Sequence, residues 1–179
     1  MNSFYTEDEL KNIGLKRYGA NVLISRFANI YSPETIEVGD NVRIDDFCIL
    51  SGNIKIANNV HISVGCYLFA GDVGIEIDDY SGISSRSAVY AISDDYSGDF
   101  LTNPTVLSKY RNIINSKVTL KKYSIVGSGS TILPGSIIEE GVAIGAMSLV
   151  KGKTEPWSIY CGIPCKKIKE RSKKLLELI

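Results

Sequence analysis

An aliphatic residue recurs at every sixth position over most of this chain. The series covers residues 38–68, resumes after a three-residue slip at 77–89, and runs again over 120–156 after a gap. Its members are Val38, Ile44, Leu50, Ile56, Ile62, Leu68, Ile77, Ile83, Val89, Leu120, Val126, Ile132, Ile138, Ile144, Val150 and Pro156. Because six is not a multiple of the helical repeat of about 3.6 residues, the pattern predicts short strands and not helices.

A second small or apolar residue lies four positions after most members of the series. These residues are Val42, Cys48, Ile54, Val60, Cys66, Ser81, Ser87, Ser124, Ser130, Ser136, Val142 and Ser148. Such a unit is one short strand plus a corner, with positions one and five facing inward. Three units close a triangular coil of roughly 18 residues, and coils stack at the ~4.8 Å spacing of paired strands. We therefore expect an all-β solenoid, a parallel β-helix over 21–163.

The two ends of the chain depart from the repeat. Thr6 and Glu9 form a capping box, and Gly14 is placed to end a short helix within 1–20. The basic segment 164–179 predicts a C-terminal amphipathic helix, whose apolar stripe would be Ile168, Leu175, Leu176 and Ile179. Both helices would cover the open ends of one domain that spans 1–179, as repeat proteins require. Contact of the basic segment with an anion is the alternative.

The repeat is interrupted between Val89 and Leu120, which predicts a protruding loop at about 91–117. Loops of this length in a compact domain are usually functional or disordered. This loop carries Tyr96, Phe100 and Tyr110, and is too aromatic for a flexible linker. It is therefore the first place to expect chemistry.

Charge and hydropathy exclude several classes of partner. Lys plus Arg number 20 and Asp plus Glu number 20, and the zero net charge argues against nucleic-acid binding. No run approaches the roughly 18 apolar residues of a membrane span, so we expect no membrane insertion. The polar, acidic start of the chain does not resemble a secretory signal. We therefore expect a cytoplasmic protein.

His61 is the only histidine, which rules out a zinc site that needs several imidazoles from one chain. The four cysteines form no CxxC pair, so we expect no metal. Cys48 and Cys66 lie one coil apart, close enough for a disulfide. Packing as small reduced residues is the favoured interpretation in a reducing compartment.

The repeat, the loop and the closing GlyIleProCysLys at 162–166 resemble the hexapeptide-repeat acyltransferases. Residues 41–52, 93–98 and 145–150 are similar to the branch that acylates nucleotide-linked 4-amino-4,6-dideoxy sugars, with sugar O-acetyltransferases nearby. The resemblance implies a left-handed β-helix and homotrimers with active sites between subunits. It implies acetyl-CoA, or a slightly longer acyl-CoA, as co-substrate in O-antigen or capsule biosynthesis.

The resemblance also indicates catalytic residues. Many members keep a histidine in the loop as general base, but this loop has none, and an acidic residue at Asp94 is the implied base. A deprotonated amine is already a good nucleophile, so a carboxylate that accepts its proton is sufficient. Burial and the neighbouring Asp95 would raise one pKa of this pair. Asx-turn capping is the structural alternative. O-acetylation, the second hypothesis, would use His61 as base.

Other candidates are assigned with less specific signals. Substrate-binding candidates are Ser84, Arg86, Asp95, Tyr96, Asn103 and Tyr110. Cofactor-binding candidates are Gly127, Ser128, Gly145, Ala146, Lys151, Pro164, Lys166 and Lys167. We expect His61 at an outward corner, either on the surface or in an intersubunit cleft. Arg86 suits a diphosphate or a surface salt bridge. The resemblance implies that the glycines leave an open groove for CoA; making turns is the structural alternative, and the two are compatible.

Two further functions are weighed against acyl transfer. A metal-dependent hydratase on this solenoid takes three histidines, which one per chain does not supply. A purely structural subunit would need no aromatic loop. Both are disfavoured.

Overall fold

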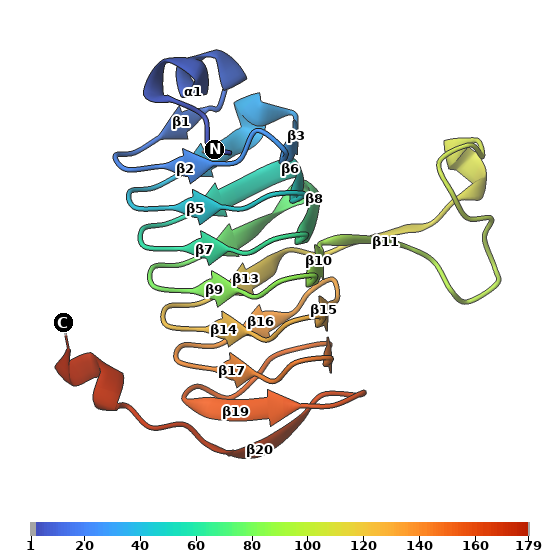
Figure 1. Cartoon of the computed structure of the whole chain (residues 1–179). Coiled ribbons are helices and arrows are strands. Elements are labelled where there is room, and N and C mark those ends of the chain that lie inside the picture. The colour runs from blue at the N-terminus through green and yellow to red at the C-terminus, as the bar shows by residue number, and fades with distance from the viewer. Residues whose placement is uncertain (1–2, 179) are drawn as a thin grey trace.

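The chain winds into a left-handed parallel β-helix with a loop that projects from its side (Figure 1). The computed structural model describes residues 3–178. Helix α1 covers one end of the solenoid, and the C-terminal segment crosses the other end. The protruding loop leaves the solenoid at β10 and returns at β13, as the interrupted repeat predicts.

Three faces of parallel strands form the solenoid. Face A holds β3 (Asn29–Tyr31), the first halves of β6 (Ile49–Ile56) and β8 (Tyr67–Ile77), β10 (Ala88–Tyr90), β15 (Thr131–Ile132) and β18 (Leu149–Val150). Face B holds β1 (Arg17–Tyr18), β4 (Ile36–Val38), the second halves of β6 and β8, β13 (Val118–Leu120) and β16 (Ile137–Ile138). Face C holds β2 (Leu23–Ile24), β5 (Arg43–Ile44), β7 (His61–Ile62), β9 (Gly82–Ile83), β14 (Ile125–Val126), β17 (Ala143–Ile144) and β19 (Ser158–Cys161).

The inward columns predicted from the repeat are confirmed by the strand register. On face C, Ile62 pairs with Ile44 on one side and with Ile83 on the other. Val126 and Ile144 continue the same column through β14 and β17. All five side chains are buried. The core is thus a stack of aliphatic side chains, each packed against the coils before and after it.

Pro156 is the one predicted inward position that is exposed. Proline has no N–H to donate to a strand ladder, so the last coil leaves the repeat here. Thr154, the fifth position of the preceding unit, is still buried, and Trp157 is buried directly after the proline. Strand β19 begins at Ser158.

Many units have a small residue at the fifth position, where it fits the tight space beside a corner. Ser81, Ser87 and Ser148 are buried there. Their hydroxyls donate to carbonyl oxygens of Lys121, Gly127 and Gly145 at 2.9, 3.1 and 2.8 Å. These bonds satisfy polar groups that burial would otherwise leave unpaired.

Cys48 and Cys66 occupy equivalent positions and are free thiols. The Cys48 thiol donates to the carbonyl oxygen of Ser63 at 3.1 Å, and that of Cys66 to the carbonyl oxygen of Ser84 at 3.2 Å. Both thus act as small buried residues, and no disulfide joins them.

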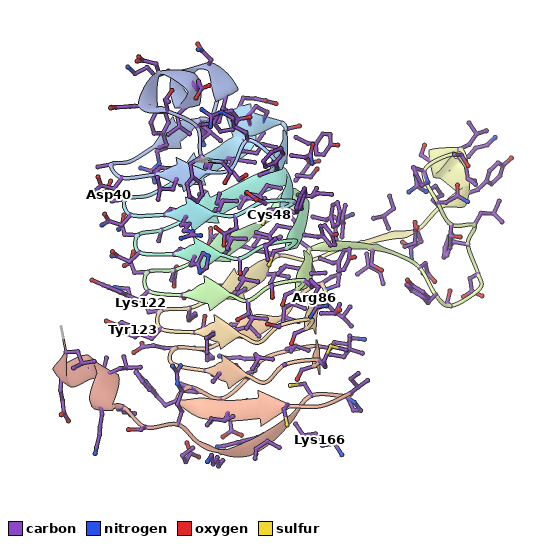
Figure 2. The ribbon with its side chains drawn as sticks, viewed as in Figure 1. Asp40, Cys48, Arg86, Lys122, Tyr123 and Lys166 are labelled. Atoms are coloured by element: carbon purple, nitrogen blue, oxygen red, sulfur yellow. The ribbon has the colours of Figure 1, made fainter. Side chains whose placement is uncertain are left out.

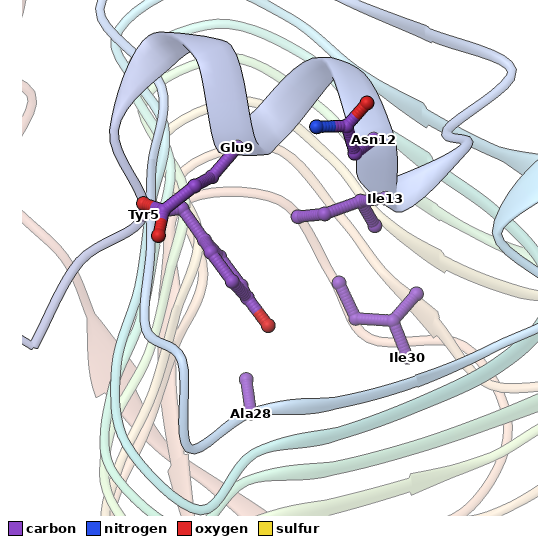
Figure 3. A pocket seen from close by; sticks show the side chains of 6 residues that line it. All are labelled: Tyr5, Glu9, Asn12, Ile13, Ala28 and Ile30. Atoms are coloured by element: carbon purple, nitrogen blue, oxygen red, sulfur yellow. The ribbon is translucent and has the colours of Figure 1, made fainter.

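Helix α1 (Glu7–Ile13) has the capping box expected from the sequence. The Thr6 backbone N–H donates to the Glu9 carboxylate at 2.7 Å, and Gly14 ends the helix in the left-handed conformation with φ of 84°. Leu10 is buried against the first coil. An open pocket of about 350 Å³ remains between the helix and this coil (Figure 3), lined by Tyr5, Glu9, Asn12, Ile13, Ala28 and Ile30.

The predicted C-terminal helix over 164–179 is wrong. Residues Lys166–Glu170 form β20, antiparallel to β19, and only a 3-10 turn, η3 (Lys174–Glu177), follows. The free edge of β19 supplies backbone partners, and this pairing overrides local helix propensity. Ile168 is exposed, so the predicted apolar stripe does not exist among the described residues, and Ile179 lies outside them.

The segment still covers the end of the solenoid, as its predicted capping role requires. Arg171 donates to the carbonyl oxygens of Tyr123 and Gly141 at 2.8 and 3.0 Å. Lys173 lies 5.6 Å from the ring centre of Trp157. These contacts hold the tail along the corner between faces B and C.

The loop is a hairpin at its base. Strand β11 (Ile92–Asp94) pairs antiparallel with β12 (Ile113–Asn115), which places Asp94 opposite Ile113. A short 3-10 turn, η2 (Ser108–Tyr110), lies in the outer part, and another, η1 (Pro33–Thr35), precedes β4. The two paired arms give the loop a defined direction away from the solenoid (Figure 1).

The close stacking of coils predicts a sharp difference between two glycines. A Cβ at position 39 would lie 2.7 Å from the carbonyl oxygen of Ala57 in the next coil, whereas one at position 82 meets nothing closer than 3.9 Å. Gly39→Ala should lower the free energy of unfolding by about 1–3 kcal/mol. Gly82→Ala, the matched control, should be neutral or slightly stabilising in the same thermal melts. Equal effects would contradict this packing.

Candidate active site

An open groove of about 870 Å³ lies where the protruding loop meets face A. We call it the loop groove. Its floor is formed by outward side chains of face A and its wall by the base of the hairpin. Its lining residues are Phe69, Tyr90, Ile92, Ser93, Asp94, Tyr96, Pro104, Arg111, Ile113, Thr131, Leu133 and Leu149. The rings of Phe69 and Tyr90 stack 5.4 Å apart. The groove therefore combines an apolar floor with a few charged groups, as small-molecule sites usually do.

Asp94 is the carboxylate of the loop groove. It ends strand β11, and its side chain is 34 % exposed. One carboxylate oxygen accepts the backbone N–H of Asn103 at 3.2 Å, and the other lies 3.5 Å from Nη2 of Arg111. These contacts orient the group while leaving it open to a ligand. A carboxylate held this way can accept a proton from a bound substrate.

Arg111 was missed by the sequence reasoning. Its side chain is only 16 % exposed, and its buried Nε has no hydrogen-bond partner among the described residues. The feature that could have pointed to Arg111 is the antiparallel pairing of the two loop arms. This pairing brings the segment just before Ile113 next to Asp94.

Asp95 differs from Asp94 although the two are adjacent. Its carboxylate accepts the backbone N–H of Ser97 and the side-chain amide of Asn112, both at 2.6 Å. These hydrogen bonds, those from Ser97 first, lower the pKa of Asp95. A raised pKa, expected for one of the pair, is therefore not found at Asp95. Asp95 accepts the backbone N–H two residues further along, as the Asx-turn alternative expects.

The other loop candidates are spread along the hairpin. Tyr96 lines the loop groove and is almost fully exposed. Asn103 donates its backbone N–H to Asp94, while its side-chain oxygen accepts the backbone N–H of Thr105. Tyr110 lies in the outer part of the loop beside Lys109 and does not line the groove.

A second, smaller groove of about 260 Å³ lies on face C. We call it the serine groove. Its lining residues are His61, Ser63, Gly82, Ile83, Ser84, Ser85, Ile125 and Ser128. His61 and the substrate candidate Ser84 are thus neighbours, together with the cofactor candidate Ser128. The expected outward orientation of His61 is right, but its place is a strand, β7, and not a corner. In a two-residue strand whose second residue, Ile62, faces the core, the first must face outward.

Asp45, also missed by the sequence reasoning, fixes His61. Its carboxylate lies 2.8 Å from Nε2 of His61 and 2.6 Å from Nε of Arg43. Burial acts to raise the pKa of Asp45, but the hydrogen bonds from Arg43 and His61 outweigh it and the pKa is lowered. The repeat itself indicates that Arg43 and His61 lie side by side, since they occupy equivalent positions on neighbouring strands.

Glycines 127 and 145 are explained by coil stacking. A Cβ on Gly127 would lie 2.5 Å from the backbone nitrogen of Ala146, and one on Gly145 would lie 2.8 Å from Cβ of Cys161. The space that the missing side chains leave is filled by the next coil. Close stacking of the coils therefore explains why both positions are glycine. A groove for CoA along this corner stays a prediction.

The remaining cofactor and phosphate candidates are exposed. Arg86 lies at the corner between faces C and A, whereas Lys166 lies on β20 at the end of the solenoid (Figure 2). Lys167 bonds Glu155 and Glu170, both at 2.6 Å, and these carboxylates raise its pKa. Lys151 is exposed, and Pro164 lies in the turn before β20.

Asp94 and His61, the two catalytic candidates, line separate grooves on different faces of one chain. Within residues 3–178, no cluster of three or more His, Cys, Asp or Glu side chains could hold a metal ion. None of the helices in this range is long and apolar enough to cross a membrane.

The hydrogen bonds of Asp95 predict that this carboxylate protects the loop against protease. Asp95→Ala removes a local turn bond from Ser97 and the bond from Asn112 that ties the two arms of the loop together, so the loop should be cut faster by protease at neutral pH. Because the pKa of Asp95 is lowered, the wild-type loop should keep its protection until the pH falls below the ordinary aspartate value of ~3.9. Asp99→Ala, an exposed change in the same loop, serves as control. Equal cleavage of both variants would contradict the assignment.

Comparisons with known proteins show which family the chain belongs to. No family model matches the chain. A curated Escherichia coli protein, dTDP-4-amino-4,6-dideoxy-D-glucose acyltransferase, is 45% identical over 179 residues, covering 98% of this chain and 93% of its own. The solved N-acyltransferase AntD from Bacillus cereus is 52% identical with a TM-score of 0.98, covering 99% of this chain and 95% of its own. WbbJ of E. coli K12, a lipopolysaccharide biosynthesis O-acetyl transferase by name, is 28% identical over 66% of this chain and 72% of its own. The chain belongs to the family of acyl-CoA-dependent N-acyltransferases that act on nucleotide-linked amino-deoxy sugars.

Proposed function

We propose that this chain transfers an acetyl or short acyl group from CoA to the amine of a dTDP-linked 4-amino-4,6-dideoxy sugar. The observation that carries the proposal is the half-buried carboxylate of Asp94 in the loop groove, in a chain that matches such enzymes along its whole length. AntD has been solved with dTDP-4-amino-4,6-dideoxyglucose and coenzyme A, and with dTDP and 3-hydroxybutyryl-CoA.

Asp94 is the proposed general base. The amine attacks the thioester carbonyl, a C–N bond forms, and the C–S bond breaks. Asp94 accepts the proton that the amine loses, and CoA leaves as the thiolate. A backbone N–H at a coil corner stabilises the oxyanion that forms in between. An amine needs only a weak base once it is deprotonated, which suits a carboxylate.

Two residue numbers shared with AntD support this site. That enzyme has been solved as S84A, S84C, S84T, D94A and D94N variants. This chain carries Ser84 and Asp94 at the same numbers, one in the serine groove and one in the loop groove. We infer that both grooves bind parts of the same pair of substrates.

The remaining candidate residues are assigned to CoA or to the sugar nucleotide according to their charge. Lys151 and Lys166 are exposed and suit the CoA phosphates as mobile cations. Lys167 is already paired with two carboxylates and contributes less. Arg86 suits the sugar diphosphate, and Tyr96 lies at the edge of the loop groove, where it can stack on sugar or base.

A homotrimer joins the two grooves in this proposal. Each groove is open on its outer side, and exposed apolar residues lie beside both: Ile113 in the loop groove and Ile125 in the serine groove. In a closed ring, the serine groove of one copy faces the loop groove of the next. Asp94 of one copy and Ser84 of its neighbour then line one intersubunit site.

The cellular role follows from the substrates. Acylated amino-deoxy sugars are building blocks of surface polysaccharides, and WbbJ is a relative named for lipopolysaccharide biosynthesis. We propose a cytoplasmic enzyme of O-antigen or capsule biosynthesis.

O-acetylation of a glycan or galactoside hydroxyl is less well supported. The relative named as an O-acetyl transferase is 28% identical, against 45% and 52% for the N-acyltransferases. Asp45 holds Nε2 of His61, the base that this alternative needs, so the case against O-acetylation rests on the sequence identities.

The catalytic assignment predicts a clear assay result. With acetyl-CoA or 3-hydroxybutyryl-CoA and dTDP-4-amino-4,6-dideoxyglucose, the wild type should release free thiol and add one acyl group to the sugar. The same sugar with a 4-hydroxyl should give no product. Asp94→Asn should lower kcat by roughly 10²- to 10⁴-fold, whereas Asp99→Asn should match the wild type. Acylation of the hydroxyl sugar, or full activity of the Asp94 variant, would refute the assignment.

The trimer predicts a mass and a complementation result. Light scattering should give three times the chain mass of 19.6 kDa. Mixed trimers of Asp94→Asn and Ser84→Ala chains should recover activity, because some sites combine the intact Asp94 of one copy with the intact Ser84 of another. A monomer, or mixtures as inactive as the separate variants, would contradict the intersubunit site.

A further inference from the structure

The side chains of Arg43, Asp45 and His61 form a chain of contacts at the edge of the serine groove. The Asp45 carboxylate is the centre: Arg43 donates to Oδ1 at 2.6 Å, and Nε2 of His61 lies 2.8 Å from Oδ2. The Asp45 side chain is 14 % exposed, whereas that of His61 is 51 % exposed. Arg43 thus holds the largely buried carboxylate of Asp45, and the half-exposed imidazole of His61 lies on the solvent side of it.

The position of Asp45 is fixed by contacts on both sides. Its backbone N–H donates to the carbonyl oxygen of Ile62 at 2.9 Å, which ties it to the coil that carries His61. The Arg43 guanidinium lies 5.2 Å from the ring centre of Phe4, in the segment that precedes helix α1. Asp45 therefore has little freedom to move away from the imidazole.

This contact determines the tautomer of His61. A carboxylate has only acceptor atoms, so the ring nitrogen bonded to it must carry the proton. In the neutral imidazole, Nε2 is therefore the donor and Nδ1 is an acceptor. No described residue hydrogen bonds to Nδ1. The acceptor is available to a ligand.

The charged and polar groups around the imidazole indicate which kind of hydrogen-bond donor the ligand must carry. Asp45 and Arg43 on β5 and its following turn are the charged groups in contact, and each is engaged by the other. Strand β9, on the other side, contributes Gly82, and the remaining polar lining is serine hydroxyls. The lone pair of His61 Nδ1 lies among neutral serine hydroxyls, and the lining of the serine groove contains no free cation. Such a site does not suit a phosphate. It suits an uncharged N–H or O–H donor.

We propose that Asp45 is a positioning residue that holds His61 with Nδ1 as an acceptor, which makes the serine groove a subsite for an uncharged N–H or O–H group of a substrate. The inference rests on the proposed function for the identity of the substrates. Two sources supply this chemistry: an amide N–H of the CoA pantetheine arm, or a hydroxyl or deprotonated amine of the sugar.

Substitution of Asp45 should reverse the tautomer. In Asp45→Asn, the amide oxygen stays with Arg43, which can only donate, so the amide N–H₂ faces Nε2 of His61. The ring must then accept at Nε2 and carry its proton on Nδ1. His61→Gln is the complementary variant, since its terminal amide can still donate to Asp45 but offers no acceptor at the position of Nδ1.

The tautomer can be read directly because His61 is the only histidine of the chain. Long-range ¹H–¹⁵N spectra of the full-length protein, taken on the neutral ring at the alkaline end of a titration, should show protonated Nε2 in the wild type. Asp45→Asn should show protonated Nδ1. Glu37→Gln is the matched control, because Glu37 also bridges two cations, Lys16 and Arg17, with a side chain 13 % exposed, but lies on face B. It should leave the wild-type spectrum unchanged.

Ligand binding separates the two sources without requiring turnover. Added CoA or dTDP-4-amino-4,6-dideoxyglucose should shift the Nδ1 resonance of the wild type, and the ligand that does so supplies the donor. In steady-state assays, Asp45→Asn and His61→Gln should each raise the KM of that same substrate about tenfold, the size of one neutral hydrogen bond, with kcat little changed. The double variant should lose no more than either single variant, because both remove one interaction.

Three results would overturn the proposal. These are protonated Nδ1 in the wild type, an Nδ1 resonance unmoved by either ligand, and an unchanged KM for both substrates in the Asp45 variant. Failure of the proposed function is distinguishable from these, since it shows as absent acyl transfer by the wild type while the spectra still report the tautomer and its response to each ligand.

Discussion

The stacking of identical short coils is the constraint on which this structure depends. Each coil buries its aliphatic side chains only against its neighbours, so the inward positions must stay aligned from coil to coil even where the chain slips by three residues or leaves for the loop. Close approach of the corners excludes a Cβ where coils touch, as at Gly127. The inward half of the sequence is thus committed to packing. Chemistry is left to the outward side chains and to the one segment that leaves the repeat.

That division explains where the two grooves lie. The loop groove forms where the hairpin of β11 and β12 rises over face A. The hairpin adds the carboxylate of Asp94 and the guanidinium of Arg111 to the aromatic rings that face A already presents. The serine groove lies on face C, where small outward residues leave a shallow hollow beside His61. An aspartate is paired with an arginine at each place: Asp94 with Arg111 in the loop groove, and Asp45 with Arg43 at the edge of the serine groove.

The parts of the molecule that the sequence predicts are those governed by the repeat. The inward columns, the protruding loop and the N-terminal capping box depend on local pattern alone, and the structure has all three. The C-terminal strand β20 was predicted as a helix because its pairing with β19 is a tertiary contact that no local period reveals. Asp45 and Arg111 were missed for the same reason, since each matters through a partner on another strand. Asp94 was found through family resemblance, and only the structure separates its contacts from those of Asp95.

The central claim is that Asp94 contacts the amine of a nucleotide-linked amino sugar in a site shared between copies. A crystal structure of the assembled protein with coenzyme A and dTDP-4-amino-4,6-dideoxyglucose tests it most directly. The account predicts the sugar amine within hydrogen-bond distance of the Asp94 carboxylate, with the serine groove of a neighbouring copy across the site. A sugar bound away from the loop groove, with Asp94 still paired only to Arg111 and Asn103, would contradict it.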